Sequence, residues 1–557
     1  MLSNRSQLVA ILFSIVLMTS CGTSKSIHHK PKTEGYNSSI SEPIIHSDSL
    51  KTIDSNILRL SKYGHWQLLV KGDPLERGLI TGSLTQELLQ YQDKVFFDKI
   101  SEIVPSKFKQ GLLRNFLKWF NRKLYLNVKE EYKTEIYGVS RFASKSYNYI
   151  APRYLRGLYL HGAHDIGHAL QDLALVGCSS FAVWDDKTPD GKLLLGRNFD
   201  FYAGDDFAKN KIISFVKPSQ GIPFASVTWG GMIGAVSAMN LKGLTITLNA
   251  GKSDMPLVAK TPISLVAREI IQYASTIDEA IAIAKKRTVF VAESLMIGSA
   301  TDNRAVLIEM SPNKFGVYDV ANNNQLLCSN HFQSEAYKDD ENNSKHILES
   351  HSKYRFDKMT ELFEKPIKIT PEIAVEVLRN KEGLHGKRIG YGNEKALNQL
   401  LAHHGVVFKP SERKLWVSSN PYQLGAFVAY DLDDVFDESF TKNSSFETTD
   451  LTISADPFMN SKEFVQYETY RNVDRTIDAL LEGKAEDATS ETLNNYIALN
   501  PDLWIPYFKV GMYYYQKKWY AKALPFFETA LTKEVTTVPD IETITKYLKK
   551  CQRKINL

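Results

Sequence analysis

The sequence predicts an α+β protein in which a layered sandwich of strands lies between two helical segments of the chain. Residues 61–177 carry leucines and other apolar residues at helical spacing. The pattern changes at Cys178, after which short apolar runs alternate with turns. A polar linker over 438–460 leads to a helical segment over 461–557. Many strands with few helices between them favour stacked layers over alternating βαβ units.

The strand-rich part opens with a predicted hairpin. Residues 181–184 and 193–196 are apolar runs on either side of a Pro189-Asp190-Gly191 turn. Further β-like runs continue to residue 317, and a helical pattern over 262–285 interrupts them. We therefore assign residues 178–437 to a single domain.

Composition and charge exclude several classes of protein. The chain has 557 residues, of which 43% are hydrophobic and 24% charged, as in ordinary globular proteins. Lys and Arg number 68 against 63 Asp and Glu, a balance too even for a nucleic-acid-binding protein. The four cysteines are too few for a disulfide framework, so each is interpreted separately. Cys328 is expected to be a buried core thiol, and Cys551 has no assigned role.

The amino terminus predicts export and lipid attachment. Arg5 precedes an apolar run over 8–18 that suits a signal peptide and is short for a membrane span. Small residues then precede Cys21 in a pattern that resembles a bacterial lipobox, so residues 1–20 are the predicted signal peptide and Cys21 the lipidation site. The alternative is a soluble secreted protein. Residues 21–60 are predicted to be a flexible tether. We expect a cell-envelope protein, held only by its lipid on the periplasmic face of the outer membrane.

The residues at the start of the sandwich indicate chemistry. Cys178 follows Gly177 at the start of the first strand, and Arg197 and Asp200 return beside it on the second. The hairpin thus brings together a thiol, a guanidinium and a carboxylate, a combination that suits a nucleophilic site. The alternative is an inert buried Cys178 beside a surface ion pair of Arg197 and Asp200.

Three further motifs resemble a known family in their chain order. They are Ala-Met-Asn-Leu-Lys-Gly-Leu over 238–244, Ser-Asn-His-Phe over 329–332, and Ser352-x-x-Arg355. With the cysteine junction they resemble the cysteine branch of the N-terminal nucleophile hydrolases. This branch includes choloylglycine (bile salt) hydrolases, penicillin V acylases and acid ceramidase, and the resemblance is closest to the acyl-CoA:6-aminopenicillanic acid acyltransferases. The resemblance covers residues 178–435. It implies a four-layer αββα sandwich and an enzyme that uses no cofactor or metal.

The resemblance also implies roles for the residues at the junction. The precursor would cut itself between Gly177 and Cys178, and the Cys178 thiol would become the nucleophile. The freed α-amine, with an ordinary pKa near 8, would replace a separate base. Arg197 would hold the thiolate and Asp200 the new ammonium group.

Asparagine amides complete the implied site. Asn330 and Asn249 would donate hydrogen bonds to the oxyanion, and Asn240 and Arg355 are further candidates from the same motifs. The expected substrate is a small molecule with a linear, non-peptide N-acyl bond, cleaved through a thioester. Hydrolysis and acyl-CoA-dependent N-acyl transfer share that intermediate, and the sequence leaves both open.

A histidine pattern before the junction offers a competing interpretation. His161, His164 and His168 would share one face of a helix, a spacing that could bind zinc. Asp165 stands where metalloprotease helices carry a glutamate base, so we favour a helix that positions the cleavage site over a metal centre. The pair His403 and His404 precedes a strand and is expected to be structural.

The carboxyl-terminal segment resembles one tetratricopeptide (TPR) unit. Its large and small residues, from Tyr507 to Ala530, follow the spacing of two packed helices. A single unit cannot bury its own faces, so we expect it to pack on the body or to bind a protein partner. The last alternative is therefore a catalytically dead lipoprotein that acts through a TPR-type binding module.

Overall fold

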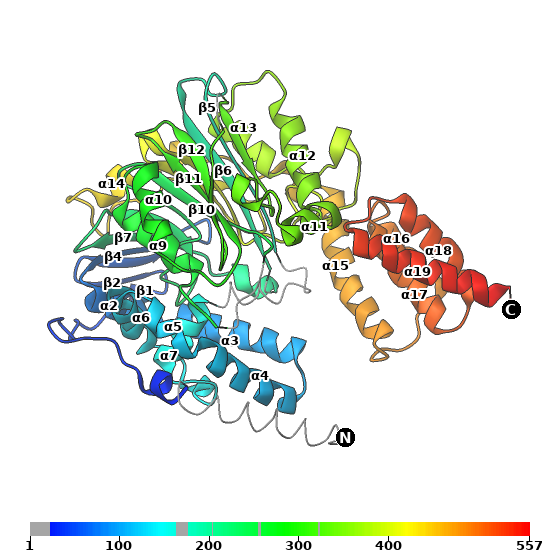
Figure 1. Cartoon of the computed structure of the whole chain (residues 1–557), viewed down its shortest axis with the longest axis horizontal. Helices are drawn as coiled ribbons and strands as arrows, with labels where there is room; N and C mark the ends of the chain where they lie inside the picture. The colour runs from blue at the N-terminus through cyan, green and yellow to red at the C-terminus, as the bar shows by residue number, and fades with distance from the viewer. Residues whose placement is uncertain (1–22, 163–175, 203, 254–257, 321–322, 557) are drawn as a thin grey trace.

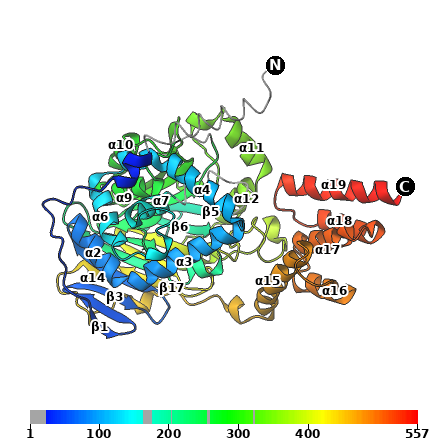
Figure 2. The same ribbon diagram turned by 90° about the horizontal axis from the view of Figure 1, so that it is seen from below.

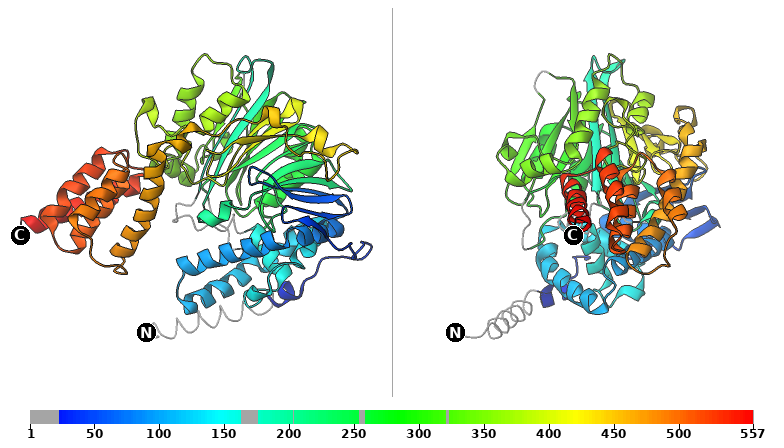
Figure 3. Two further views of the ribbon diagram at one scale, coloured as in Figure 1. Left: turned by 180° about the vertical axis from the view of Figure 1, so that it is seen from behind. Right: turned by 90° about the vertical axis from the view of Figure 1, so that its right-hand side faces the viewer.

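Two stacked β-sheets with helices on both outer faces form the body of the protein (Figures 1 and 3). The computed structural model describes residues 23–162, 176–202, 204–253, 258–320 and 323–556. The predicted signal peptide, Cys21, His164 and His168 lie outside these residues.

The larger sheet runs through both the amino-terminal segment and the strand-rich domain. Among the described residues it has eleven strands, and all neighbours are antiparallel except β4 and β7, which are parallel. In spatial order they are β1 (Ile44–Ser47), β2 (Leu50–Ile53), β3 (Asn56–Leu60), β4 (Trp66–Gly72), β7 (Ile212–Pro218), β8 (Phe224–Thr228), β9 (Ser237–Asn240), β10 (Leu244–Ala250), β11 (Glu293–Ser299), β12 (Arg304–Met310) and β13 (Phe315–Tyr318).

The smaller sheet contains the predicted hairpin at its centre. Its strands in spatial order are β14 (Gln325–Cys328), β5 (Val176–Asp185), β6 (Gly191–Phe201), β15 (His404–Lys409), β16 (Lys414–Ser418) and β17 (Phe427–Asp431). The hairpin of β5 and β6 is therefore confirmed, and it places the start of β5 and the end of β6 side by side.

Helices cover the sheets and form the carboxyl-terminal region. The amino-terminal helices are α2 (Pro74–Leu84), α3 (Gln86–Ile103), α4 (Lys107–Phe120), α5 (Leu124–Asn127), α6 (Glu130–Ser140) and α7 (Arg153–His161). Those of the central domain are α9 (Ile263–Tyr273), α10 (Ile277–Lys285), α11 (Glu341–Glu349), α12 (Ser352–Phe363), α13 (Pro371–Leu378) and α14 (Leu432–Phe436). The last are α15 (Lys462–Leu481), α16 (Ser490–Leu499), α17 (Trp504–Gln516), α18 (Tyr520–Thr532) and α19 (Val538–Ile555).

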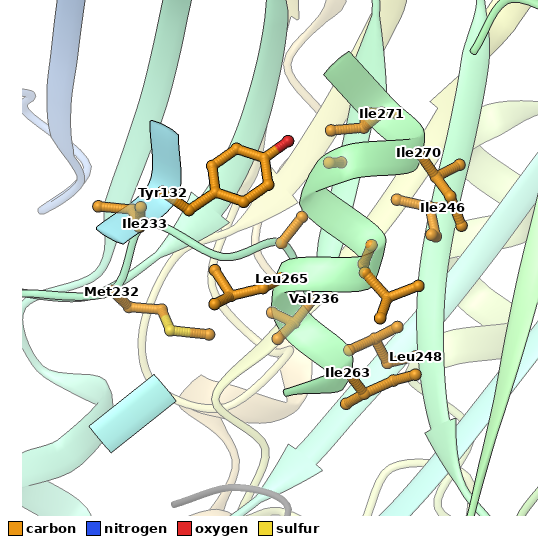
Figure 4. Close-up of a cluster of buried hydrophobic side chains, with 14 of the residues drawn as sticks. Tyr132, Met232, Ile233, Val236, Ile246, Leu248, Ile263, Leu265, Ile270 and Ile271 are labelled. Atoms are coloured by element: carbon orange, nitrogen blue, oxygen red, sulfur yellow. The ribbon is translucent and has the colours of Figure 1, made fainter. Parts of the chain in front are cut away.

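Three buried apolar layers confirm the αββα order. Helices α2, α6 and α9 pack on the larger sheet, α12 and α13 pack on the smaller one, and the two sheets share a core between them. Figure 4 shows part of the first layer, where Ile263 and Ile270 of α9 face Ile246 and Leu248 of β10. Because strand residues alternate between faces, each sheet can contribute to a core on both of its sides.

The tether predicted over 21–60 is wrong for its described part. Residues 44–60 form β1, β2 and β3, because their apolar residues fill the edge of the larger sheet. Upstream, Ser26 is buried and the His29 ring lies 4.2 Å from the Tyr125 ring, centroid to centroid. The predicted helical segment also opens with a strand, β4.

The segment predicted as a linker over 438–460 packs on the body. Phe440 and Phe446 are buried in the core between the sheets, and Ile453 pairs with Phe427, the first residue of β17. The sequence prediction was wrong here because these few aromatic residues lie in a stretch of otherwise polar character.

The carboxyl-terminal helices form a separate core against one end of the body. The predicted pair is present as α17 and α18, where Gly511 lets the ring of Phe527 approach the backbone. Leu400 and Leu424 of the body are buried in the same cluster, and Asp205 forms ion pairs with Arg471 and Arg475 of α15. The TPR likeness remains a prediction.

Candidate active site

The β5–β6 hairpin brings Cys178 and Arg197 to one face of the smaller sheet. Cys178 pairs with Phe199 and Ser180 with Arg197, and paired residues of antiparallel strands share a face. Arg197 Nη2 accordingly lies 3.7 Å from Cys178 Sγ. This face looks toward the larger sheet, so the thiol is enclosed between the sheets and is only 1% exposed.

Arg197 is held by groups of the larger sheet. Its guanidinium donates to the carbonyls of Val236 and Leu248 and to Ser237 Oγ, and it lies 4.2 Å from the centre of the Phe199 ring. These contacts leave the guanidinium, which contacts the sulfur, little freedom to move. Arg197 is therefore a fixed positive charge beside Cys178.

Burial and Arg197 act on the thiol in opposite directions. Burial raises the pKa of Cys178 above its ordinary value, and the positive charge of Arg197 offsets part of this rise. Glu293, a buried carboxyl at the start of β11, adds to the rise. In the uncut chain the thiol is thus protonated at neutral pH and needs a base to become a nucleophile.

Arg355 reaches the same residue from the helical layer. It lies in the first turn of α12, fully buried, and donates to the carbonyl oxygen of Cys178 (2.6 Å) and to Ser179 Oγ (2.9 Å). Behind it, Arg355 Nε donates to His351 Nδ1 at 3.2 Å. The candidate Arg355 is thus brought into direct contact with the nucleophile's backbone.

Asn330 binds the other end of Cys178. Its Oδ1 accepts hydrogen bonds from the Cys178 N–H (2.9 Å) and from Arg355 Nη2 (2.6 Å), and its amide nitrogen donates to the carbonyl of Ala250. Ser352 Oγ in turn accepts from the Asn330 N–H. The amide oxygen, rather than the amide N–H, faces Cys178 in this uncut form, so the oxyanion role stays a prediction.

Asn249 lies next to this group but makes different contacts. Its Oδ1 accepts from Ser180 Oγ at 2.7 Å, and its Nδ2 donates to the carbonyls of Cys328 and Ser329. It is one β-strand position from the Leu248 carbonyl that binds Arg197. Its predicted role as an oxyanion donor also stays a prediction.

Asp200 occupies the opposite face of β6, across from Gly177. The two residues are paired in register, so Asp200 stands across the hairpin from the residue before the predicted scissile bond. Burial raises the pKa of Asp200 to about 7, although Arg355 and a hydrogen bond from Gln423 lower it. Among the described residues Asp200 Oδ2 has no hydrogen-bond partner. A carboxyl with this pKa can accept a proton near neutral pH.

Asn240 is not part of this group. Its Nδ2 donates to the carbonyls of Ile271 and Ala274, and its Oδ1 accepts from the backbone of Lys242 and Leu244. These bonds close the turn between β9 and β10 and attach it to α9. The family-like motif over 238–244 therefore has a structural function here.

Ser237 and His404 lie behind Arg197, a contact that the sequence did not reveal. Ser237 Oγ, which binds Arg197, also lies 2.8 Å from His404 Nε2, and His404 Nδ1 lies 2.8 Å from His403 Nδ1. Burial holds the pKa of both histidines well below the usual range, so the rings are neutral. His404 lies near Arg197 because strand β15 pairs with β6 in this register. The two residues are far apart in the sequence, so their spacing could not predict the contact.

No metal site accompanies these residues in the described part of the chain, where no three potential ligands cluster. His161 Nδ1 binds the Gly157 carbonyl and its Nε2 accepts from the Ile233 N–H, so both ring nitrogens have protein partners. The other two histidines of the proposed zinc pattern lie outside the described residues. Likewise, no described helix has the length and apolar character needed to span a bilayer.

Aromatic side chains line a small cavity near the nucleophile. Phe201, Phe207 and Trp229 are in its wall, and its volume is about 40 Å³. Phe199, the partner of Cys178 in the hairpin, stacks on both Phe201 and Trp229. A wider cleft of about 760 Å³ lies between α3, the end of β6 and α15.

Residues 187–421 match the family model for acyl-coenzyme A:6-aminopenicillanic acid acyl-transferase. The match begins after Cys178 and includes Arg197, Asp200, Asn330 and Arg355. It supports an enzyme of the N-terminal nucleophile type, an amide hydrolase or acyltransferase. It covers less than half of the chain.

Other comparisons give weaker likeness. An uncharacterized protein from Archaeoglobus fulgidus is 27% identical over 274 residues, which cover 46% of this chain and 45% of that protein. The match thus spans less than half of that relative. A solved Caenorhabditis elegans N-acylethanolamine-hydrolyzing acid amidase ortholog is 18% identical, with TM-score 0.32, over 42% of this chain and 93% of the other. A solved mutant of the conjugated bile acid hydrolase from Clostridium perfringens is 12% identical, with TM-score 0.26; the match covers 48% of this chain and 93% of that chain.

Proposed function

We propose that this protein cuts itself between Gly177 and Cys178 and then acts as an N-terminal cysteine amide hydrolase or acyltransferase on linear N-acyl bonds. The observation that carries the proposal is the position of Cys178. Its sulfur lies 3.7 Å from Arg197, its carbonyl and N–H are bound by Arg355 and Asn330, and the residue before it pairs with Asp200 across the hairpin.

These contacts support a route for self-cleavage. Cys178 Sγ attacks the Gly177 carbonyl carbon and gives up its proton, while Asp200 lies across the hairpin on the other face of β6. The C–N bond breaks, the proton passes to the departing nitrogen, and Gly177 is left in a thioester. Water then cleaves the thioester, which yields the Gly177 carboxylate and a free amine and thiol on Cys178.

Turnover uses the two groups that cleavage releases. The α-amine, with an ordinary pKa near 8, takes the thiol proton as Sγ attacks the substrate's amide carbon. The same proton then goes to the leaving amine, and the acyl group remains on sulfur. Arg197 stabilises the thiolate, and the N–H groups of Asn330 and Asn249 can turn toward the oxyanion once the scissile peptide has gone.

The acceptor of the acyl group decides between hydrolysis and transfer. With water as acceptor the product is the free acid, and with an amine it is a new amide. If acyl-CoA were the acyl donor, the leaving group would be the thiol of coenzyme A. The rings of Phe201, Phe207 and Trp229 beside Phe199 support an apolar contact with the part of the substrate next to the acyl carbon.

Fragment analysis tests the proposal. The purified wild-type chain should run as two fragments, the larger beginning at Cys178, whereas Cys178→Ala should stay whole. Cys328→Ala is the matched control, since Cys328 is a buried thiol on the neighbouring strand β14 and should not affect cleavage. A panel of N-acyl amides, with and without an added amine, then separates hydrolysis from transfer. An uncut wild-type chain without amidase activity would contradict the proposal.

We also place the protein at the cell envelope through a lipid on Cys21. Incorporation of labelled palmitate into the wild-type chain, and its loss in Cys21→Ser, is the expected result. Protease accessibility on intact cells distinguishes a periplasmic face from the cell surface. Labelling that persists in Cys21→Ser would contradict the assignment.

A further inference from the structure

Helix α4 presents an apolar stripe to solvent. Phe108, Leu112 and Phe116 follow one another at intervals of four residues, and their side chains are 76%, 56% and 47% exposed. Figure 1 shows α4 at the lower edge of the molecule, away from the strands, and the view from below in Figure 2 shows it beside α3. Large apolar side chains exposed together on one helix mark a surface that contacts something else.

The charges around the stripe are of one sign. Residues 107–127 contain six Lys or Arg residues and no Asp or Glu. Lys107, Lys109, Arg114 and Lys118 are on α4 itself, and Arg122 lies over the Trp119 ring. An amphipathic helix with aromatic and aliphatic residues on one side and basic residues beside them is suited to the surface of an anionic bilayer.

The docked amino-terminal segment lies on the same layer of helices. Ile27 packs on the core that these helices share, the His29 ring contacts the Tyr125 ring of α5, and the Lys32 N–H donates to Glu130 at the start of α6. Residues 121–123 lead directly from α4 to α5. Cys21 is five positions before Ser26 in the sequence, a span of at most about 18 Å of extended chain.

We propose that the stripe of Phe108, Leu112 and Phe116 inserts into the interface of an anionic lipid bilayer. The basic residues of α4 would lie among the headgroups, and the rings and the leucine among the first methylenes of the acyl chains. This contact is distinct from the lipid on Cys21. It would fix the orientation of the body, since a helix face and a nearby anchor together leave little freedom to rotate.

A local probe tests the proposal in the full-length chain. An environment-sensitive fluorophore is attached to Leu112→Cys, and in a matched chain to Val465→Cys on α15, where the side chain is 62% exposed. Both probes are placed in a Cys178→Ala background, which removes the nucleophilic thiol, and the native Cys328 and Cys551 are buried, which directs labelling to the new thiol. Vesicles contain phosphatidylcholine alone or with 30% phosphatidylglycerol. With the anionic vesicles, the probe at 112 should shift to the blue and be quenched by bilayer-located nitroxide lipid.

Vesicle binding by variants completes the test. Phe108→Ser/Leu112→Ser/Phe116→Ser should lower partitioning into anionic vesicles at least about tenfold. The control Leu348→Ser/Val465→Ser/Trp519→Ser removes exposed apolar side chains elsewhere and should leave partitioning unchanged. The proposal would be overturned if the probes at 112 and 465 responded equally to the anionic vesicles, or if the two triple variants bound these vesicles equally. It would also be overturned if the fluorescence of the probe at 112 changed with protein concentration in the absence of lipid. None of these readouts depends on amidase activity.

Discussion

Arg355 donates a 2.6 Å hydrogen bond to the carbonyl oxygen of Cys178 and so connects helix α12 to the backbone of the nucleophile. A second donor of the same guanidinium binds Asn330 Oδ1, the atom that accepts the Cys178 N–H. One buried side chain thus controls both the carbonyl and, through Asn330, the N–H of Cys178. Its effect on the thiol is positional, in contrast to the direct contact of Arg197.

Removal of this guanidinium should slow self-cleavage. Arg355→Ala is expected to reduce the cleavage rate at least about tenfold, because the Cys178 carbonyl loses a fixed donor and Asn330, which binds the Cys178 N–H, loses another. Arg355→Lys should be intermediate, since an ammonium group cannot reproduce the planar fork. The rate is measured as fragment formation on a denaturing gel. Arg379→Ala is the control, because this buried arginine binds only backbone carbonyls away from Cys178. Equal cleavage by Arg355→Ala and wild type would contradict the expectation.

Asp200 should make the uncut chain less stable as the pH rises. Burial raises its pKa from 3.8 to about 7, so the folded chain binds the proton more tightly than the unfolded chain between these values. The free energy of unfolding must then fall from pH 4 to pH 7. In a Cys178→Ala background, Asp200→Asn should therefore stabilise the chain by about 4 kcal/mol at pH 8 and by little at pH 4. Urea unfolding at both pH values measures this; a pH-independent difference would contradict it.

Ser237 should act as a positioning residue for Arg197. Its hydroxyl accepts from Arg197 Nη1 and can donate to the neutral His404 ring, so Ser237→Ala removes one of the two hydrogen bonds that hold this nitrogen in the described structure; the other, to the Val236 carbonyl, remains. We expect cleavage to slow several-fold and the thiol pKa to rise, seen as an alkylation profile displaced to higher pH. Ser226→Ala, another buried serine whose hydroxyl has no partner in the described structure, is the control. An unchanged alkylation profile in Ser237→Ala would argue for a merely structural serine.

Gly390 should be essential for docking of the carboxyl-terminal helices. Its φ is +82°, and a Cβ there would lie 2.4 Å from the backbone nitrogen of Leu503. Gly390→Ala should cost about 2–4 kcal/mol and expose the region 461–557 to protease. Gly483→Ala has a similar φ of +72° but open space around it, so it should cost only about 1 kcal/mol. Equal melting temperatures of the two variants would contradict this reasoning.

The fold was predictable where one pattern dominates a segment. The hairpin around Pro189 to Gly191 and the helix pair α17 and α18 depend on local turn chemistry and periodicity. The strands β1, β2 and β3 were missed because a mostly polar stretch at the sheet edge needs only a few buried residues. The packing of residues 438–460 was missed for the same reason.

The site was predictable only in part, again for physical reasons. Cys178, Arg197 and Asp200 lie on one hairpin, so the sequence alone brings them together. Arg355 and Asn330 depended on motif resemblance, and the structure places both against Cys178. Ser237, His404 and Gln423 join the site through contacts between distant strands, which no local pattern encodes.

The parallel pairing of β4 with β7 has a consequence for the cleaved protein. The break at Gly177 would leave β1 to β4 on one polypeptide and β7 to β13 on the other, joined by the ladder from Trp66 to Gly72. Neither piece could leave without opening a sheet whose two faces are buried. The mature protein would then be an obligate two-chain molecule that melts as one unit. Its recovery from denaturant would become a second-order process, dependent on concentration, whereas the uncut chain would refold at a rate independent of dilution.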